Sequence, residues 1–305
     1  MSKVNVSKLN TLTGHNDCVY TLEKSQFDNK FFSGAGDGMV VCWDFNDPEN
    51  GKLLAKLPNS VYGLHYSESL NILAVGHNYD GIHLIDWEKG EEVGSLNMTK
   101  ASIFDIQSYQ GHFLVGDSSG LLTVVEANTL QITAKVQVSS QSIRTIALNE
   151  EQGEVALGTS DNHIYILDLE DLKVKHKISA HDNSVFTLKY SPDKQLLLSA
   201  GRDAHLKIWD VNAGYMKFED IVAHMYAINN IELSPDGKHF VTCSMDKSIK
   251  VWSMENFKLL KVIDKARHAG HGTSVNKLLW SKHNNTLVSA SDDRTISVWN
   301  LEFNN

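Results

Sequence analysis

The segment LKIWD at residues 206–210 has three close counterparts in the chain: VVCWD at 40–44, IKVWS at 249–253 and ISVWN at 296–300. Six residues before each tryptophan stands an aspartate, and a hydroxyl-bearing residue stands four residues before each aspartate. A histidine stands 22 residues before each aspartate. Four copies of one pattern at constant spacing predict a repeat protein. The repeated residues are His15, Ser33, Asp37 and Trp43; His181, Ser199, Asp203 and Trp209; His224, Thr242, Asp246 and Trp252; and His271, Ser289, Asp293 and Trp299.

Three weaker copies of the repeat fill the interval between residues 44 and 181. The pairs Ile85-Asp86, Val125-Glu126 and Leu167-Asp168 occupy their Trp-Asp positions. Seven repeats account for essentially the whole chain, which predicts a single domain over residues 1–305. The repeats end near residues 43, 85, 125, 167, 209, 252 and 299.

Within each repeat, apolar and polar residues alternate with a period of two, which is typical of strands rather than helices. In the fifth repeat, residues 185–190, 195–199 and 206–209 are predicted to form three short strands separated by turn-forming residues. A fourth strand is expected after the Trp-Asp pair, as at residues 52–57 of the first repeat. Four antiparallel strands repeated seven times predict an all-β fold, a single seven-bladed β-propeller.

The spacing of Gly-His, Asp and Trp-Asp resembles that of the WD-repeat family (WD-40 type), and the resemblance spans all 305 residues. The motif is nearly complete in blades one, five, six and seven, whereas blades two to four lack its histidine and tryptophan. The resemblance implies that the repeated histidine, hydroxyl, aspartate and tryptophan form a buried hydrogen-bond network inside each of the four blades.

The two ends of the chain are expected to join in the last blade, because an open edge strand invites pairing with another chain. Only six residues follow Trp299, too few for a fourth strand. Residues 4–12 are therefore predicted to complete the last blade, with Val4, Val6 and Leu9 available to pack. A ring closed in this way does not require oligomerisation.

The composition narrows the classes of function. The net charge of −9 argues against a nucleic-acid partner, which needs a basic face. The sequence has no run of about 18 apolar residues, so no membrane span is predicted. Residues 1–8 also lack the apolar core of a signal peptide. Three widely spaced cysteines fit a reducing compartment, so a cytoplasmic location is expected.

Three motifs resemble chemical sites, and each has a simpler interpretation. His15, Ser33 and Asp37 have the composition of a hydrolase triad, but a catalytic site does not need four copies. The G-x-S-x-G match at residues 116–120 aligns with a hairpin turn. His268 and His271 are three residues apart, but His271 already belongs to a blade network. We therefore predict no catalytic residue, no metal site and no cofactor.

A binding surface is predicted where the innermost strands border the central channel. In each blade this strand begins with an aliphatic residue, and the following side chain should point towards the channel mouth. Aromatic residues and arginine at such positions are typical of interfaces, although they could also simply fill the axis. These channel-rim residues are Tyr20, Tyr62, Phe104, Arg144, Phe186, Asn229 and Asn276.

A weaker, basic rim is predicted on the same face. The last interval between repeats is the longest, and its extra residues fall in the loop 264–270. The basic-rim residues are Arg202, Lys265, Arg267, His268 and Arg294. The expected function is a non-enzymatic scaffold that binds a protein or peptide on the rim around the channel. The alternative is a lactonase- or esterase-like propeller enzyme that uses the channel as its active-site pocket.

Overall fold

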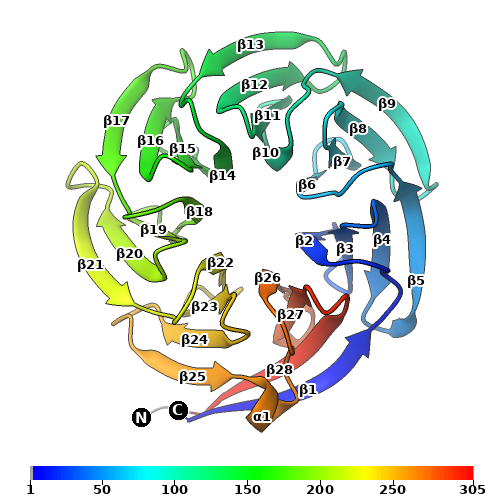
Figure 1. Ribbon diagram of the computed structural model, residues 1–305, viewed down its shortest axis with the longest axis vertical. Coiled ribbons are helices and arrows are strands. Elements are labelled where there is room, and N and C mark those ends of the chain that lie inside the picture. The colour runs from blue at the N-terminus through cyan, green and yellow to red at the C-terminus, as the bar shows by residue number, and fades with distance from the viewer. Residues whose placement is uncertain (1–2, 305) are drawn as a thin grey trace. The chain divides into compact units, whose positions relative to one another are not determined.

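In the computed structural model, which describes residues 3–304, the chain is folded almost entirely into β-strands (Figure 1). The first and last residues of the expected 1–305 domain lie outside the described residues. The described chain divides into two compact units. Unit 1 holds residues up to Val61 together with those from Asn229 onward, and unit 2 holds Tyr62–Ile228.

Unit 2 contains four sheets, each built from four strands that follow one another in the chain. The first strands of successive sheets contact each other, and the fourth strands form the opposite edges. The strands are β6 (Leu64–Ser67), β7 (Ile72–His77), β8 (Gly81–Asp86) and β9 (Glu91–Asn97); β10 (Ile103–Tyr109), β11 (His112–Asp117), β12 (Leu121–Glu126) and β13 (Ile132–Gln137); β14 (Ile143–Asn149), β15 (Glu154–Thr159), β16 (His163–Asp168) and β17 (Val174–Ser179); and β18 (Val185–Tyr190), β19 (Leu196–Gly201), β20 (His205–Asp210) and β21 (Met216–Val222).

Unit 1 contains the other three sheets, apart from Ile228, the first residue of β22. Two of these sheets again use four successive strands, and the third combines the two ends of the chain. The strands are β2 (Val19–Lys24), β3 (Lys30–Ala35), β4 (Met39–Asp44) and β5 (Asp47–Lys56); β22 (Ile228–Leu233), β23 (His239–Ser244), β24 (Ile249–Ser253) and β25 (Leu259–Ile263); and β26 (Val275–Trp280), β27 (Thr286–Ser291), β28 (Ile296–Asn304) and β1 (Lys3–Leu12).

The fold is all-β, a seven-bladed propeller with four antiparallel strands in each blade, as the sequence predicts. Every tryptophan-equivalent residue lies in the third strand of its sheet, from Trp43 in β4 to Trp299 in β28. Neighbouring sheets pack through their faces. In unit 2, for example, Val185, Tyr190 and Trp209 share one buried cluster with Ile164 and Ile166 of the preceding sheet.

The predicted closure of the last blade is confirmed, because β1 pairs antiparallel with β28 from Lys3 to Leu12. Val4 and Leu12 are buried at 2% and 3% exposure. Leu9 was expected to pack as well, but it is 52% exposed. The register shifts between Lys8 and Asn10, so Leu9 is the extra residue of a β-bulge, and its side chain faces solvent.

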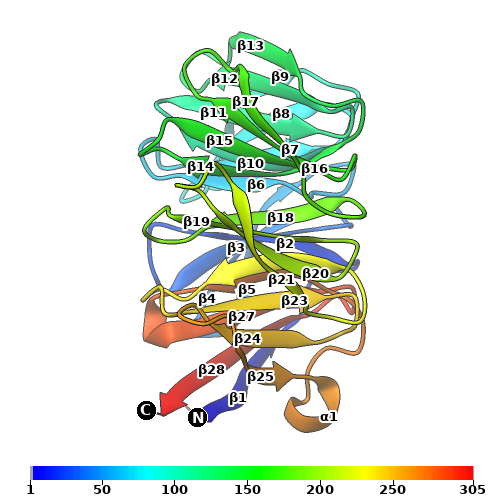
Figure 2. The same cartoon turned by 90° about the vertical axis from the view of Figure 1, so that its left-hand side faces the viewer.

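The long loop before His271 contains a short helix, α1 (Lys265–His268), and a second short turn, η1 (His283–Asn285), precedes β27. Asp264 caps α1 by accepting a hydrogen bond from the backbone amide of Arg267. Figures 1 and 2 both show α1 beside β1, and the Lys8 ammonium donates a hydrogen bond to the carbonyl of Ala269 at 3.0 Å. Within residues 3–304, no helix has the length and apolar character needed to cross a membrane.

Candidate functional site

The repeated polar residues of blade five form a closed hydrogen-bond chain. The His181 ring lies between Asp203 and Ser199. Its Nδ1 is 2.9 Å from the Asp203 carboxylate, and its Nε2 is 2.8 Å from the Ser199 hydroxyl. Trp209 donates its indole N–H to the same hydroxyl at 2.8 Å. A buried loop, strand and turn are thereby joined without leaving their polar groups unsatisfied.

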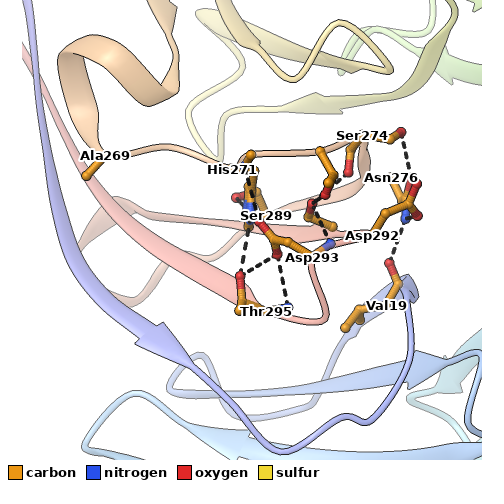
Figure 3. A network of polar contacts seen from close by, with 12 residues as sticks. Val19, Ala269, His271, Ser274, Asn276, Ser289, Asp292, Asp293 and Thr295 are labelled. Carbon is orange, nitrogen blue, oxygen red and sulfur yellow. Dashed lines mark hydrogen bonds and ion pairs between the residues drawn. The ribbon is translucent and has the colours of Figure 1, made fainter.

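The same arrangement recurs in blades one and seven. In blade seven, shown in Figure 3, His271 lies 2.9 Å from both Asp293 and Ser289. In blade one, His15 lies 2.7 Å from Ser33, but its Nδ1 is 3.5 Å from the Asp37 carboxylate. Trp43 and Trp299 each donate to the serine of their own blade, at 2.8 and 2.9 Å, respectively. Blade six keeps the hydrogen bond from Trp252 to Thr242 at 2.9 Å, and both His224 and Thr242 are buried.

The serine hydroxyls of these networks are unsuited to nucleophilic attack. Ser33, Ser199 and Ser289 are fully buried, and each hydroxyl already accepts the indole N–H of a tryptophan. A substrate carbonyl could not reach them without unfolding the blade. The G-x-S-x-G match at residues 116–120 is the turn between β11 and β12, where Gly120 adopts φ +79°, and no helix follows it.

The carboxylates of the networks are held ionised. Burial alone would raise the pKa of Asp203, but hydrogen bonds from His181 and from the backbone amides of Asp182 and His205 outweigh burial and lower the pKa to about 2. The pKa of Asp293 is lowered in the same way, by His271 and Thr295 against the opposing effect of burial. These aspartates therefore act as permanent acceptors at neutral pH.

Blades three and four build substitute networks that the sequence comparison of repeats did not reveal. In blade three, Thr99 stands at the histidine position and donates to the Asp117 carboxylate at 2.9 Å. In blade four, the Asp161 carboxylate accepts hydrogen bonds from Ser139 at 2.8 Å and from Tyr165 at 2.7 Å. The available signal was the hydroxyl residue four positions before the first strand, where blades one, five, six and seven carry histidine.

The predicted channel-rim positions share one local geometry. Each follows an aliphatic residue that is completely buried, and each is itself partly exposed. In five blades the strand register shifts at this position, so the rim residue is the unpaired residue of a β-bulge. A bulge redirects a side chain out of the regular alternation of the strand. The five bulge residues are Tyr20, Phe104, Arg144, Phe186 and Asn276.

The four rim residues of unit 2 stack on one another. The Arg144 guanidinium lies over the ring of Phe104, with its central carbon 3.9 Å from the ring centroid, and 4.9 Å from the centroid of Phe186. The ring of Tyr62 packs against Phe104 with centroids 5.6 Å apart. We call these four residues, Tyr62, Phe104, Arg144 and Phe186, the aromatic–arginine stack.

The charge of Arg144 has no acidic partner within residues 3–304, where this side chain makes neither a hydrogen bond nor an ion pair. The nearby carboxylate of Asp105 instead accepts the backbone amide of Ile146 at 2.7 Å. Burial lowers the pKa of Arg144 to about 10, so the guanidinium is still protonated at neutral pH. The stack therefore presents a partly dehydrated cation with unused hydrogen-bond donors.

The rim residues of unit 1 are more fully engaged in internal contacts. Asn276 donates from its amide to the carbonyl of Val19 at 3.0 Å and to the Asp292 carboxylate at 2.7 Å (Figure 3). Asn229 donates to Ser274 and to the carbonyl of Val275 at 3.0 and 2.8 Å, respectively. These amides link strands of the fold, so a ligand would compete with existing hydrogen bonds. Tyr20, the second residue of β2, is partly exposed.

The predicted basic rim is weaker than its composition indicates. Arg267 donates two side-chain hydrogen bonds to the Asp264 carboxylate, at 2.6 and 2.9 Å, so its charge is locally compensated. His268 is half-buried, and burial lowers its pKa, which favours the neutral imidazole. Lys265 is exposed on α1, and Arg202 and Arg294 are exposed in turns of units 2 and 1, respectively.

Comparison with known proteins shows the family of the repeats and a solved structure with a similar fold. The family model "WD domain, G-beta repeat" matches residues 6–44, 172–210, 217–253 and 262–300, about half of the chain. These segments contain the four complete copies of the histidine, hydroxyl, aspartate and tryptophan motif. Among solved structures, the crystal structure of the WD40 beta propeller domain of Doa1 is similar, with a TM-score of 0.85 and 18% sequence identity over 97% of each chain. The search of curated proteins gave no match.

Proposed function

Because the chain belongs to the WD40 family of G-beta repeats, we propose that it is a non-enzymatic scaffold whose aromatic–arginine stack binds a protein or peptide. WD40 propellers typically mediate protein interactions. The observation that carries the proposal is Arg144, a cation held between two aromatic faces without an acidic partner in the described chain. A side chain needed only to fill space would not have to be charged.

The chemistry of the stack favours a ligand with a carboxylate. A guanidinium binds a carboxylate through two parallel hydrogen bonds, and such pairs strengthen where water is partly excluded. The stacking on Phe104 and Phe186 fixes the guanidinium plane before a ligand arrives, which reduces the entropy lost on binding. The ligand we propose is therefore a peptide segment with an aspartate, a glutamate or a free carboxyl terminus, flanked by an apolar residue for the aromatic rings.

The proposed binding surface also includes the rim residues outside the aromatic–arginine stack. Tyr20, Asn229, Asn276 and the basic rim are predicted to contribute secondary contacts. A single domain over residues 1–305, a cytoplasmic location and independence from oligomerisation also stay predictions.

The proposal is tested by selecting peptides from a displayed library on the purified chain and measuring their affinities. Arg144→Glu should weaken binding of the selected peptides at least tenfold, because a carboxylate would then face a carboxylate. The double variant Tyr62→Ala with Phe186→Ala should weaken it similarly by removing the apolar contact. Lys135→Glu is the matched control, since it reverses an exposed charge on β13, the outer strand of a sheet in the same unit.

Thermal unfolding of all variants separates loss of binding from loss of fold. Selected peptides enriched in carboxylates, with binding lost in both stack variants and kept in Lys135→Glu, support the proposal. Binding that survives both stack variants would remove this site from consideration.

A further inference from the structure

The irregular turn of blade two brings together three side chains with metal-binding atoms. His77 ends β7, Asp80 lies in the turn and His83 lies in β8. The ligand atoms His77 Nδ1, Asp80 Oδ2 and His83 Nε2 all lie within 4.8 Å of one another. We propose that these residues bind a divalent transition metal, Zn²⁺, with one coordination position left open to solvent.

The distances between the three ligand atoms fit a tetrahedral ion. They are 3.1 Å between the two nitrogens, 3.3 Å from His77 Nδ1 to Asp80 Oδ2, and 3.5 Å from His83 Nε2 to Asp80 Oδ2. Zinc bonds of about 2.0–2.2 Å at tetrahedral angles separate the ligand atoms by about 3.3–3.5 Å. The triangle therefore already has the size of one face of a zinc tetrahedron. Two imidazoles and one carboxylate are ligands that suit zinc.

Second residues orient two of the ligands. Glu92 on β9 lies 2.9 Å from His83 Nδ1, so this nitrogen carries the proton and Nε2 is left with its lone pair towards the site. Asn97, also on β9, donates to Asp80 Oδ1, which directs Oδ2 towards the two histidines. A carboxylate on the outer nitrogen of a histidine is the usual second contact of a metal-binding imidazole.

The backbone holds the turn in place. The Asp80 carbonyl accepts the amides of Met98 and Thr99 at 2.8 and 3.2 Å, and Tyr79 has φ +67° in the left-handed region. The side chains of His77 and His83 are 9% and 13% exposed, whereas that of Asp80 is 34% exposed. The ligands are thus largely fixed, and the open position lies on the side where Asp80 meets solvent.

The paired nitrogens need something between them. With Nδ1–H of His83 donated to Glu92, two lone pairs would face each other at 3.1 Å unless a proton or a metal ion lies between them. A proton on His77 Nδ1 gives an N–H···N hydrogen bond that satisfies the two nitrogens, whereas a metal ion would bind both nitrogens and the Asp80 oxygen at once. The proposal is independent of the aromatic–arginine stack.

The test measures zinc directly. Chelator-treated protein is loaded with two equivalents of Zn²⁺, passed through a desalting column and analysed for metal by mass spectrometry, and the affinity is measured by competition with a coloured chelator. We expect one zinc ion per wild-type chain, with binding lost in His83→Ala and in Asp80→Ala. Glu92→Gln should lower the affinity by about 10- to 100-fold without removing a ligand. Co²⁺ should give the visible absorption of a tetrahedral complex in the wild type but not in His83→Ala or Asp80→Ala.

The matched control is His205→Ala, which removes a histidine on β20 of the same unit. His205 Nδ1 lies 2.6 Å from Asp220 on β21, and no third metal-binding side chain within residues 3–304 joins this pair. This variant should retain one zinc ion. Circular dichroism establishes that the His83→Ala and Asp80→Ala chains are folded. Zinc retained equally by folded His83→Ala, or no zinc retained by the wild type, would overturn the proposal.

Discussion

Closure of the last blade can be tested at two leucines of β1, one buried and paired with β28 and the other exposed in the bulge. Leu12 is 3% exposed and belongs to a buried cluster with Trp43 and Val298. Leu9, three residues earlier on the same strand, is 52% exposed because it occupies the bulge. Replacing each by alanine changes the same number of atoms in the same strand, so the difference between the variants reports burial alone.

The expected magnitudes follow from these environments. Leu12→Ala removes a buried side chain and leaves a cavity, which costs about 2–5 kcal/mol. For a chain of this length, each kcal/mol lowers Tm by about 2 °C, so Tm should fall by about 4–10 °C. Leu9→Ala should change the free energy of unfolding by less than about 0.5 kcal/mol, because its side chain is already hydrated.

Urea titration followed by tryptophan fluorescence measures both variants, since Trp43 reports on the cluster that contains Leu12. The urea midpoint is the quantity compared, with thermal unfolding as an independent check. Equal destabilisation by the two substitutions would refute the register between β1 and β28, and with it the orientation of every side chain on β1.

Two further variants test the buried polar groups. The pKa of Asp203, lowered to about 2 from 3.8 by hydrogen bonds such as that from His181, means that its carboxylate stabilises the fold above about pH 4 and loses this effect as the pH falls to about 2. The wild type should therefore lose about 2 kcal/mol over this range that Asp203→Asn does not, as measured by urea unfolding at several pH values. Tyr215→Phe removes the hydrogen bond that Tyr215 donates to buried Glu154 at 2.6 Å and should cost about 1–3 kcal/mol, whereas Tyr79→Phe, at an exposed side chain, should cost less than about 0.5. A stability difference between the wild type and Asp203→Asn that does not change with pH would contradict the role given to Asp203. Equal destabilisation by Tyr215→Phe and Tyr79→Phe would contradict the role given to Tyr215.

The sequence predicts the architecture well because the repeated motif consists of groups that must touch. Buried polar groups generally have hydrogen-bond partners, and His181 has one on each ring nitrogen, so the constant spacing of the histidine, hydroxyl and aspartate indicates a similar three-dimensional arrangement in each copy. Where other residues satisfy the same requirement, spacing alone fails. Thr99 replaces histidine in blade three and Tyr165 contributes a hydroxyl in blade four, and neither residue type marks a network by itself.

Sequence alone did not predict which rim side chains already make hydrogen bonds within the fold. Asn276 and Arg144 stand at equivalent positions, and both residue types suit a binding surface. The amide of Asn276 is donated within the fold, whereas the guanidinium of Arg144 stacks on two aromatic rings and makes no hydrogen bond or ion pair with residues 3–304. The difference depends on neighbours from other strands, such as Asp292, which a local pattern does not contain. The sequence analysis missed the cluster of His77, Asp80 and His83 for a similar reason, because its residues come from the end of β7, the turn that follows and β8, and this turn departs from the repeat.

The rim positions explain how a repeated fold can carry a surface that does not repeat. At each of them, the preceding aliphatic residue is completely buried and fixes the strand, as Ile143 does before Arg144. A bulge residue makes no regular ladder pair, so replacing the side chain of Arg144 removes no backbone pair of the sheet, whereas replacing Asn276 would also remove hydrogen bonds that link strands. Tyrosine, phenylalanine, arginine and asparagine can therefore occupy equivalent positions at little cost in stability. Arg144 lies at such a position, and we propose that it also contacts a partner, so variants of Arg144 should lose binding while keeping the stability of the wild type.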